Sequence, residues 1–141
     1  MTPQERADRS AKAMWSEDGA SKWFGMELLS VTEGHAEATL TVAGHHANGL
    51  GACHGGVIFA LADTAFAFAC NSRNQATVAQ QNTIVYLAPA RVGDRLIAIA
   101  DEISLAGRSG LYDVAVRNQD GALIARFTGL SRTVRGHLFE E

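Results

Sequence analysis

The 141-residue chain carries 12 Lys and Arg residues against 15 Asp and Glu residues, and 47% of its residues are hydrophobic. This balance is typical of a water-soluble globular protein. It argues against a nucleic-acid partner, because a nucleic-acid binder needs a basic surface. No apolar run reaches the ~20 residues that span a bilayer and no signal peptide is recognisable, so we expect a cytoplasmic protein with no membrane partner. The length suits a single domain over residues 1–141.

The first predicted element is a helix. Thr2, Pro3 and Glu5 form the pattern of a capping box with proline at the first helical position, so a helix should begin there. We expect it to run to about Glu17, with Gly19 as its stop.

Strand and turn signals fill the rest of the chain around one further helix. A glycine-rich loop over residues 43–54 leads into a long helix over 55–72. The expected strands are 26–32, 35–42, 77–88, 95–106, 110–118 and 122–134. This order predicts the α+β class, with an antiparallel sheet packed on one central helix.

The second helix contains an apolar run, Val57–Cys70, that holds one acid. Histidines aside, Asp63 is the only charged residue between Glu37 and Arg73. An unpaired carboxylate in apolar surroundings is costly, because burial disfavours its ionised form. Asp63 is therefore either paired with a distant group or kept for chemistry, and we favour chemistry.

Small residues surround this acid on one face of the helix. Gly56, Ala60 and Ala67 lie around Asp63, whereas the rest of the helix is apolar and larger. A helix that is apolar on nearly every side should be covered on nearly every side. We expect the sheet to cover most of it and the small-residue face to approach another subunit.

The start of the same helix is suited to binding an oxyanion. Unpaired N–H groups at a helix N-terminus favour a negatively charged oxygen, and Gly55 and Gly56 let a substrate approach the backbone closely. The Gly55 N–H would stabilise a carbonyl oxygen as it becomes an oxyanion. The alternative is that the glycines only permit a tight loop.

Helix geometry separates these two features within one chain. Gly55 and Asp63 are eight residues apart, which places them about 12 Å apart along a helix axis. Reacting groups must meet at about 3–3.5 Å. If both are catalytic, two antiparallel copies must share the site, and the protein is at least a dimer.

The segment from Asn48 to Ser72, NGLGACHGGVIFALADTAFAFACNS, resembles the signature of hotdog-fold acyl-CoA thioesterases of the PaaI type, from phenylacetic acid degradation. The likeness also covers QQNTIVYLAPARVGDRL (80–96) and SGLYDVAV (109–116). It implies a hotdog fold, in which an antiparallel sheet wraps a long central helix. It further implies hydrolysis of phenylacetyl-CoA or hydroxyphenylacetyl-CoA thioesters by a homodimer or a dimer of dimers, without a metal or redox cofactor.

The resemblance also implies roles for individual residues. Asp63 would act as nucleophile or general base, and the Gly55 N–H would polarise the thioester carbonyl. Asn48 would orient water or the acyl carbonyl, His54 would hold the turn or assist that hydrogen bonding, and Thr64 would support the carboxylate. Some relatives carry a hydroxyl one turn after the acid, where this chain has Ala67.

The resemblance places the coenzyme A binding region at Arg108, Ser109 and Gly110, with Arg132 as a weaker candidate. The acyl pocket is less defined, because alternation alone does not place its candidate lining residues, which are Phe59, Asn82 and Tyr86.

Other readings remain open. His54 and Asp63 could serve a hotdog hydratase or dehydratase, and a non-enzymatic acyl-CoA sensor would need the groove but not the carboxylate. The cluster of His45, His46, Cys53 and His54 could suggest a metal site, but adjacent histidines on an extended segment point apart. We expect loop histidines beside a pocket there.

Overall fold

The computed structural model describes residues 1–141, and its first helix begins as the sequence predicts. In α1 (Pro3–Glu17), the Thr2 hydroxyl accepts a hydrogen bond from the Glu5 N–H at 3.1 Å, and the Thr2 N–H donates to Glu5 Oε2 at 2.8 Å. The predicted stop at Gly19 is wrong. Asp18 ends α1 and caps a second short helix, α2 (Gly19–Phe24), because its carboxylate accepts the Ser21 N–H at 2.9 Å.

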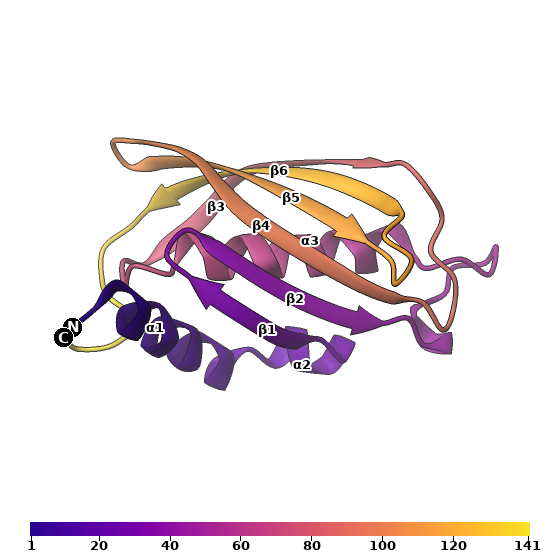
Figure 1. Ribbon diagram of the computed structural model, residues 1–141, viewed down its shortest axis with the longest axis horizontal. Coiled ribbons are helices and arrows are strands. Elements are labelled where there is room, and N and C mark those ends of the chain that lie inside the picture. The colour runs from indigo at the N-terminus through magenta and orange to yellow at the C-terminus, as the bar shows by residue number, and fades with distance from the viewer.

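Six strands form one antiparallel sheet in the order β1-β2-β4-β5-β6-β3 (Figure 1). Their bounds lie within a few residues of the predicted ones. The strands are β1 (Glu27–Thr32), β2 (His35–Thr41), β3 (Thr77–Tyr86), β4 (Arg95–Ala106), β5 (Ser109–Arg117) and β6 (Leu123–Thr133). The predicted α+β class is confirmed.

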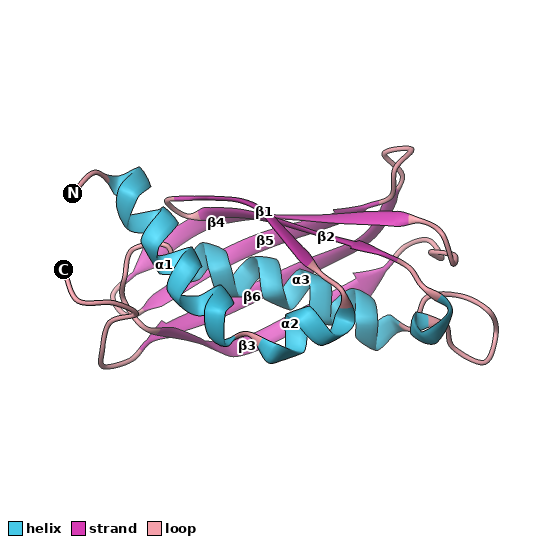
Figure 2. Cartoon of the chain, turned by 90° about the horizontal axis from the view of Figure 1, so that it is seen from below, coloured by secondary structure: helices cyan, strands magenta, loops and turns pink.

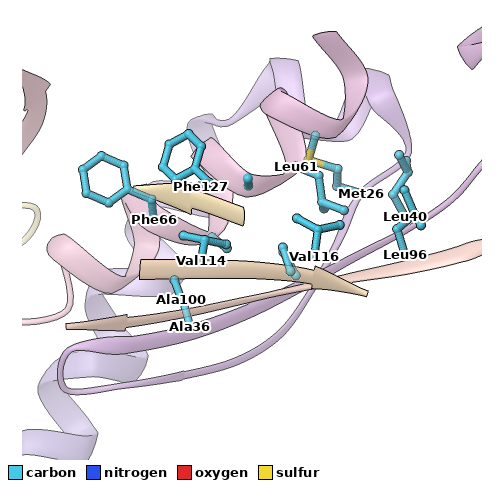
Figure 3. Packing of buried hydrophobic residues seen from close by; sticks show 14 of the residues in the cluster. Met26, Ala36, Leu40, Leu61, Phe66, Leu96, Ala100, Val114, Val116 and Phe127 are labelled. Carbon is cyan, nitrogen blue, oxygen red and sulfur yellow. The ribbon is translucent and has the colours of Figure 1, made fainter. Parts of the chain in front are cut away.

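The long helix α3 (Gly55–Cys70) lies along one face of this sheet, and α1 and α2 lie beside it (Figure 2). Leu61 and Phe66 of α3 are fully buried against the inward side chains of the strands, such as Val114 and Phe127 (Figure 3). Several inward residues of β2 and β4 are alanines, which lets the helix axis approach the sheet closely. They are Ala36, Ala38, Ala98 and Ala100.

The sheet leaves one side of α3 uncovered, as the sequence predicts. Gly56 is exposed, and Ala60, Asp63 and Ala67 are half-buried, whereas their neighbours on the other side of the helix are buried. The strip faces the space between α2 and β3. Asp63 is therefore accessible in the isolated chain even though it lies in the middle of the most apolar helix.

β3 is an edge strand with large exposed apolar side chains. It pairs only with β6, and Val78, Val85 and Tyr86 are about half exposed. The two termini lie close together at one end of the molecule (Figure 1), where Arg6 pairs with Glu141. None of the helices combines the length and the apolar character needed to cross a membrane.

Candidate functional site

The loop before α3 is held by the side chain of Asn48. Its Oδ1 accepts hydrogen bonds from the Leu50 N–H at 2.9 Å and the Ala52 N–H at 3.1 Å. Both partners are donors, so the carbonyl oxygen is committed to the loop and the Nδ2 amide hydrogens point away from these contacts. If Asn48 binds water or the acyl carbonyl, it does so as a donor.

His54 caps the helix. Its Nδ1 accepts a hydrogen bond from the Gly56 N–H at 2.8 Å, so the neutral ring carries its proton on Nε2. A Cβ on Gly56 would lie 3.0 Å from this nitrogen, so the cap needs glycine there. His54 thus holds the turn that presents Gly55.

Gly55 is the first residue of α3 and has an unused donor. No group of the chain accepts a hydrogen bond from its N–H, whereas its carbonyl accepts one from the Tyr86 hydroxyl at 2.8 Å. A Cβ on Gly55 would lie 3.1 Å from the Tyr86 hydroxyl oxygen. The glycine therefore permits Tyr86 to pack at the start of the helix and leaves the N–H open.

A hollow of about 340 Å³ opens beside this N–H. Most of its walls are apolar, and they join the helix start to the chain that follows β3. The lining residues are Cys53, Gly55, Ile58, Tyr86, Leu87, Ala88, Pro89 and Ala90. A free N–H at the rim of an apolar hollow can hold the oxygen of a bound carbonyl.

Asp63 lies two turns further along α3. Burial raises the pKa of its carboxyl group, and the hydrogen bond from Asn82 Nδ2 to Asp63 Oδ1, at 3.0 Å, acts in the opposite direction. Asp63 forms no ion pair with any cation of the chain. The carboxylate is therefore half-buried, held on one oxygen and left without a charge partner.

Thr64 lies next to Asp63 but faces α2. Its hydroxyl is 3.2 Å from the Ser21 hydroxyl, and Ser21 in turn donates to Asp18 at 2.7 Å. This chain of contacts ties α3 to α2. Any support that Thr64 gives the neighbouring carboxylate passes through the backbone of the helix.

The structure places the residues expected to bind coenzyme A in different surroundings. Arg108 lines a polar hollow of about 540 Å³ together with Gln75, Thr133 and Arg135. Ser109 is half-buried at the start of β5, and Arg132 is exposed on the outer face of the sheet. Gly110 is buried, and a Cβ there would lie 2.8 Å from Ser131 Oγ, so packing alone requires this glycine.

Sequence reasoning missed Arg135, which joins Arg108 at this hollow. It also named Asn82 and Tyr86 only as possible lining residues, although Asn82 contacts Asp63 and Tyr86 contacts Gly55. Residues 82, 84 and 86 alternate onto the inner face of β3, but the β-bulge between Ala79 and Gln81 breaks the alternation earlier in the strand. The chain gives no local sign of that bulge.

Within the histidine cluster, His46 is committed to the backbone. His46 is buried, its Nδ1 accepts the Ala43 N–H at 2.9 Å, and its Nε2 lies 2.8 Å from the Phe24 carbonyl oxygen. The expectation that His45 and His46 point apart is wrong, because both lie in one 3₁₀ turn and their ring centroids are 4.2 Å apart. The structure holds no group of three or more His, Cys, Asp or Glu residues arranged to bind a metal ion.

A sequence profile of the thioesterase superfamily matches residues 50–125, which include the end of the loop, the whole of α3, three complete strands and the start of β6. The chain belongs to the thioesterase superfamily. The sequence-based assignment to thioesterases is therefore confirmed at the level of the family.

Relatives of this thioesterase share most of its length. The acyl-coenzyme A thioesterase PaaI of Escherichia coli K12 is 40% identical over 96% of this chain and 97% of its own. The solved structure of the E. coli PaaI protein, 40% identical, superposes with a TM-score of 0.94 over 96% of this chain and 99% of that one, which confirms the predicted hotdog fold. A Streptococcus mutans protein solved with acetyl-CoA is 27% identical over 79% of this chain and 90% of its own, with a TM-score of 0.76.

Proposed function

We propose that this thioesterase hydrolyses aryl-acetyl thioesters of coenzyme A, of the phenylacetyl-CoA and hydroxyphenylacetyl-CoA type, in the cytoplasm during aromatic catabolism. The observation that carries the proposal is that α3 bears two groups suited to the reaction: the open Gly55 N–H and the carboxylate of Asp63, which has no cation beside it. The first suits a developing oxyanion and the second suits a base or nucleophile. The likeness to E. coli PaaI supports the choice of thioester.

The carbonyl carbon is attacked while its oxygen lies against the Gly55 N–H. If Asp63 acts as general base, it takes a proton from water, the water oxygen adds to the carbon, and the carbon–sulfur bond breaks. The departing thiolate then takes the proton from Asp63. If Asp63 acts as nucleophile, its oxygen forms a mixed anhydride as the thiolate leaves, and water hydrolyses that anhydride.

Both groups must come from different copies of the chain. The two lie about 12 Å apart along one helix, and two antiparallel copies would place the helix start of one beside the Asp63 of the other. β3 supports this assembly, because it is an unpaired sheet edge that bears exposed Val78 and Val85. A second copy that pairs along β3 covers these side chains and the small-residue strip of α3.

The polar hollow at Arg108 suits the polyanionic end of coenzyme A. Arg108 and Arg135 bring two positive charges to its rim, and Gln75 and Thr133 add neutral polar groups. Arginine binds phosphate through paired donors, so these two residues are better placed for it than Gly110. Ser109, next to Arg108, would belong to the same phosphate-binding site, whereas Arg132 lies on the outer face of the sheet and is outside it.

The hydratase alternative finds no support in the geometry. His54 Nδ1 is occupied by the Gly56 N–H, which commits this nitrogen to the helix cap. An acyl-CoA sensor remains the second outcome of the test, because it requires the groove without turnover.

Release of free coenzyme A tests the proposal directly. We expect the wild-type protein to hydrolyse phenylacetyl-CoA and hydroxyphenylacetyl-CoA faster than a short aliphatic acyl-CoA. Asp63→Asn keeps the shape of the side chain and removes its charge, and we expect a 10²–10⁴-fold fall in kcat. Tight binding without turnover of any thioester would instead identify a sensor.

Mixing two inactive variants tests the shared site. Asp63→Asn and Gly55→Ala subunits, exchanged into mixed dimers, should restore one intact site per dimer. The matched control mixes each variant with itself under the same exchange conditions. Full subunit exchange without recovered activity would contradict a site built from two copies.

A further inference from the structure

Asn82 is the one polar side chain that β3 presents to the middle of α3. It pairs with Gly129 of β6 and shares the inner face of β3 with Ile84 and Tyr86. The β-bulge between Ala79 and Gln81 lies immediately before Asn82 in the strand. Bulges often re-aim side chains beside functional sites, and here the regular alternation that brings Asn82 to Asp63 begins directly after the bulge.

Only the Nδ2 group of the Asn82 amide forms a hydrogen bond within the chain. Its Nδ2 donates to Asp63 Oδ1 at 3.0 Å, whereas its Oδ1 is sealed from solvent and has no hydrogen-bond partner in the chain. A buried polar atom without a partner destabilises a fold, and an aliphatic residue would avoid that cost. Positions that break such a rule without structural benefit are often functional.

We infer that Asn82 is a positioning residue for Asp63: its amide occupies Oδ1, fixes the rotamer of the carboxylate and leaves Oδ2 to face the thioester. This inference rests on the proposed function. The bond requires a donor, because a carboxylate only accepts, and it therefore favours the ionised form of Asp63 that a base or nucleophile needs.

No charged group of the chain performs this task. From α2, Ser21 reaches Thr64 and Asp18 rather than Asp63. On α3 itself, the ionisable neighbour is the Cys70 thiol, which is buried and whose pKa is raised by that burial to about 12. Asn82 is thus the group that opposes the effect of burial on Asp63.

Two near-isosteric substitutions test this role. Asn82→Leu removes the donor, and Asn82→Asp replaces it with a second carboxylate at the same place. We expect the pKa of Asp63, measured by NMR of its side-chain carboxyl carbon, to rise in the order wild type, Asn82→Leu, Asn82→Asp. The acid limb of the kcat–pH profile should move in the same order, with kcat about 100-fold lower and KM little changed in Asn82→Leu.

A control variant separates positioning from general effects of mutation. Thr128→Val makes a similar polar-to-apolar change on the exposed outer face of β6, beside Gly129, and should leave both the carboxyl titration and kcat unchanged. An unaltered Asp63 titration in Asn82→Leu, or unaltered kcat, would overturn the inference. A wild-type protein inactive on every thioester would overturn the proposed function alone, because the order of pKa values is read without substrate.

Discussion

Two half-buried carboxylates in this molecule have opposite surroundings. Glu102 of β4 receives two hydrogen bonds from the Arg73 guanidinium, at 2.6 and 3.0 Å, and one from the Tyr112 hydroxyl at 2.9 Å. Asp63 of α3 receives one, from a neutral amide. The Arg73 guanidinium lowers the pKa of Glu102, whereas burial raises the pKa of Asp63.

The difference shows that the acid with a structural role, Glu102, is paired with a cation, whereas Asp63 is not. Arg73, just beyond α3, joins Glu33 of the first hairpin to Glu102, so one cation closes the C-terminal end of the helix. At the start of the helix the Gly55 N–H has no partner in the chain, and in its middle Asp63 accepts one hydrogen bond, from the neutral Asn82 amide, and has no cation. We call the Arg73–Glu102 contact beyond Cys70 the structural end of the helix, because its polar groups are satisfied. The reactive end is the half from Gly55 to Asp63, whose polar groups have no charged partner.

After Asp63→Asn, the largest effect on activity should come from a substitution at the start of the helix. In Gly55→Ala the new Cβ would lie 3.1 Å from the Tyr86 hydroxyl oxygen, so Tyr86 or the first turn must shift. We expect kcat on phenylacetyl-CoA to fall about 100-fold, because the N–H no longer meets the developing oxyanion.

Steady-state kinetics checks this effect, with Gly49→Ala as the control. Gly49 lies in the same loop and has open space around the position of a Cβ. Unchanged kcat in Gly55→Ala would remove the oxyanion donor from the mechanism.

Loss of the Arg73–Glu102 ion pair at the structural end should lower the free energy of unfolding and leave catalytic activity unchanged. Arg73→Met leaves Glu102 partly buried without its cation, and we expect a loss of about 2 kcal/mol in the free energy of unfolding, less than for a fully buried pair because Arg73 is about a third exposed. Arg126→Met breaks the more exposed pair with Asp113 and should cost much less.

Urea denaturation of both arginine variants measures these costs. Activity well below the unfolding temperature should match the wild type in each. Equal costs for the two substitutions would contradict a special role for the Arg73–Glu102 pair.

Much of this contrast is visible in the sequence. Asp63 is an isolated acid in an apolar run, and the glycine-rich turn before it is local, so both can be read from neighbouring residues. The capping box of α1 and the strand alternation are local in the same sense. For this reason the helices and strands fall within a few residues of their predicted bounds, apart from α2.

The residues whose roles were not predicted from the sequence depend on contacts between distant segments. Asn82 reaches Asp63 only because of the sheet register and the bulge in β3, and Arg135 joins Arg108 only after β6 has returned beside β5. Asp18 serves two helices at once, which no single cap signal reveals. Strand register and the pairing of β6 with β5 are set by tertiary structure, so local sequence patterns did not predict the roles of these residues.

The pH dependence of stability should have opposite sign at the two carboxylates. A raised folded-state pKa favours the neutral acid, so Asp63 destabilises the fold once pH rises from its ordinary value of 3.8 through the raised value. A lowered pKa favours the ionised acid, so Glu102 stabilises the fold above its ordinary value of 4.5 and loses this effect as pH falls through the lowered value.

Unfolding of two amide variants across pH 3–8 separates these contributions. Relative to wild type, Asp63→Asn should gain stability towards neutral pH, with the change above pH 3.8. Glu102→Gln should lose stability at neutral pH and approach wild type below pH 4.5. Parallel curves for the two variants would show that the carboxylates are not opposed as the structure indicates.

The smallest effect concerns Thr64, which lies at the border of the reactive end. Its hydroxyl contacts Ser21 of α2 at 3.2 Å, so Thr64→Val should cost about 0.5 kcal/mol by loosening α2 and should leave kcat unchanged. Thr64→Ser keeps the hydroxyl and serves as the control. A fall in kcat without a fall in stability would show that Thr64 supports Asp63 after all, and that the reactive end of α3 extends one residue further than its contacts indicate.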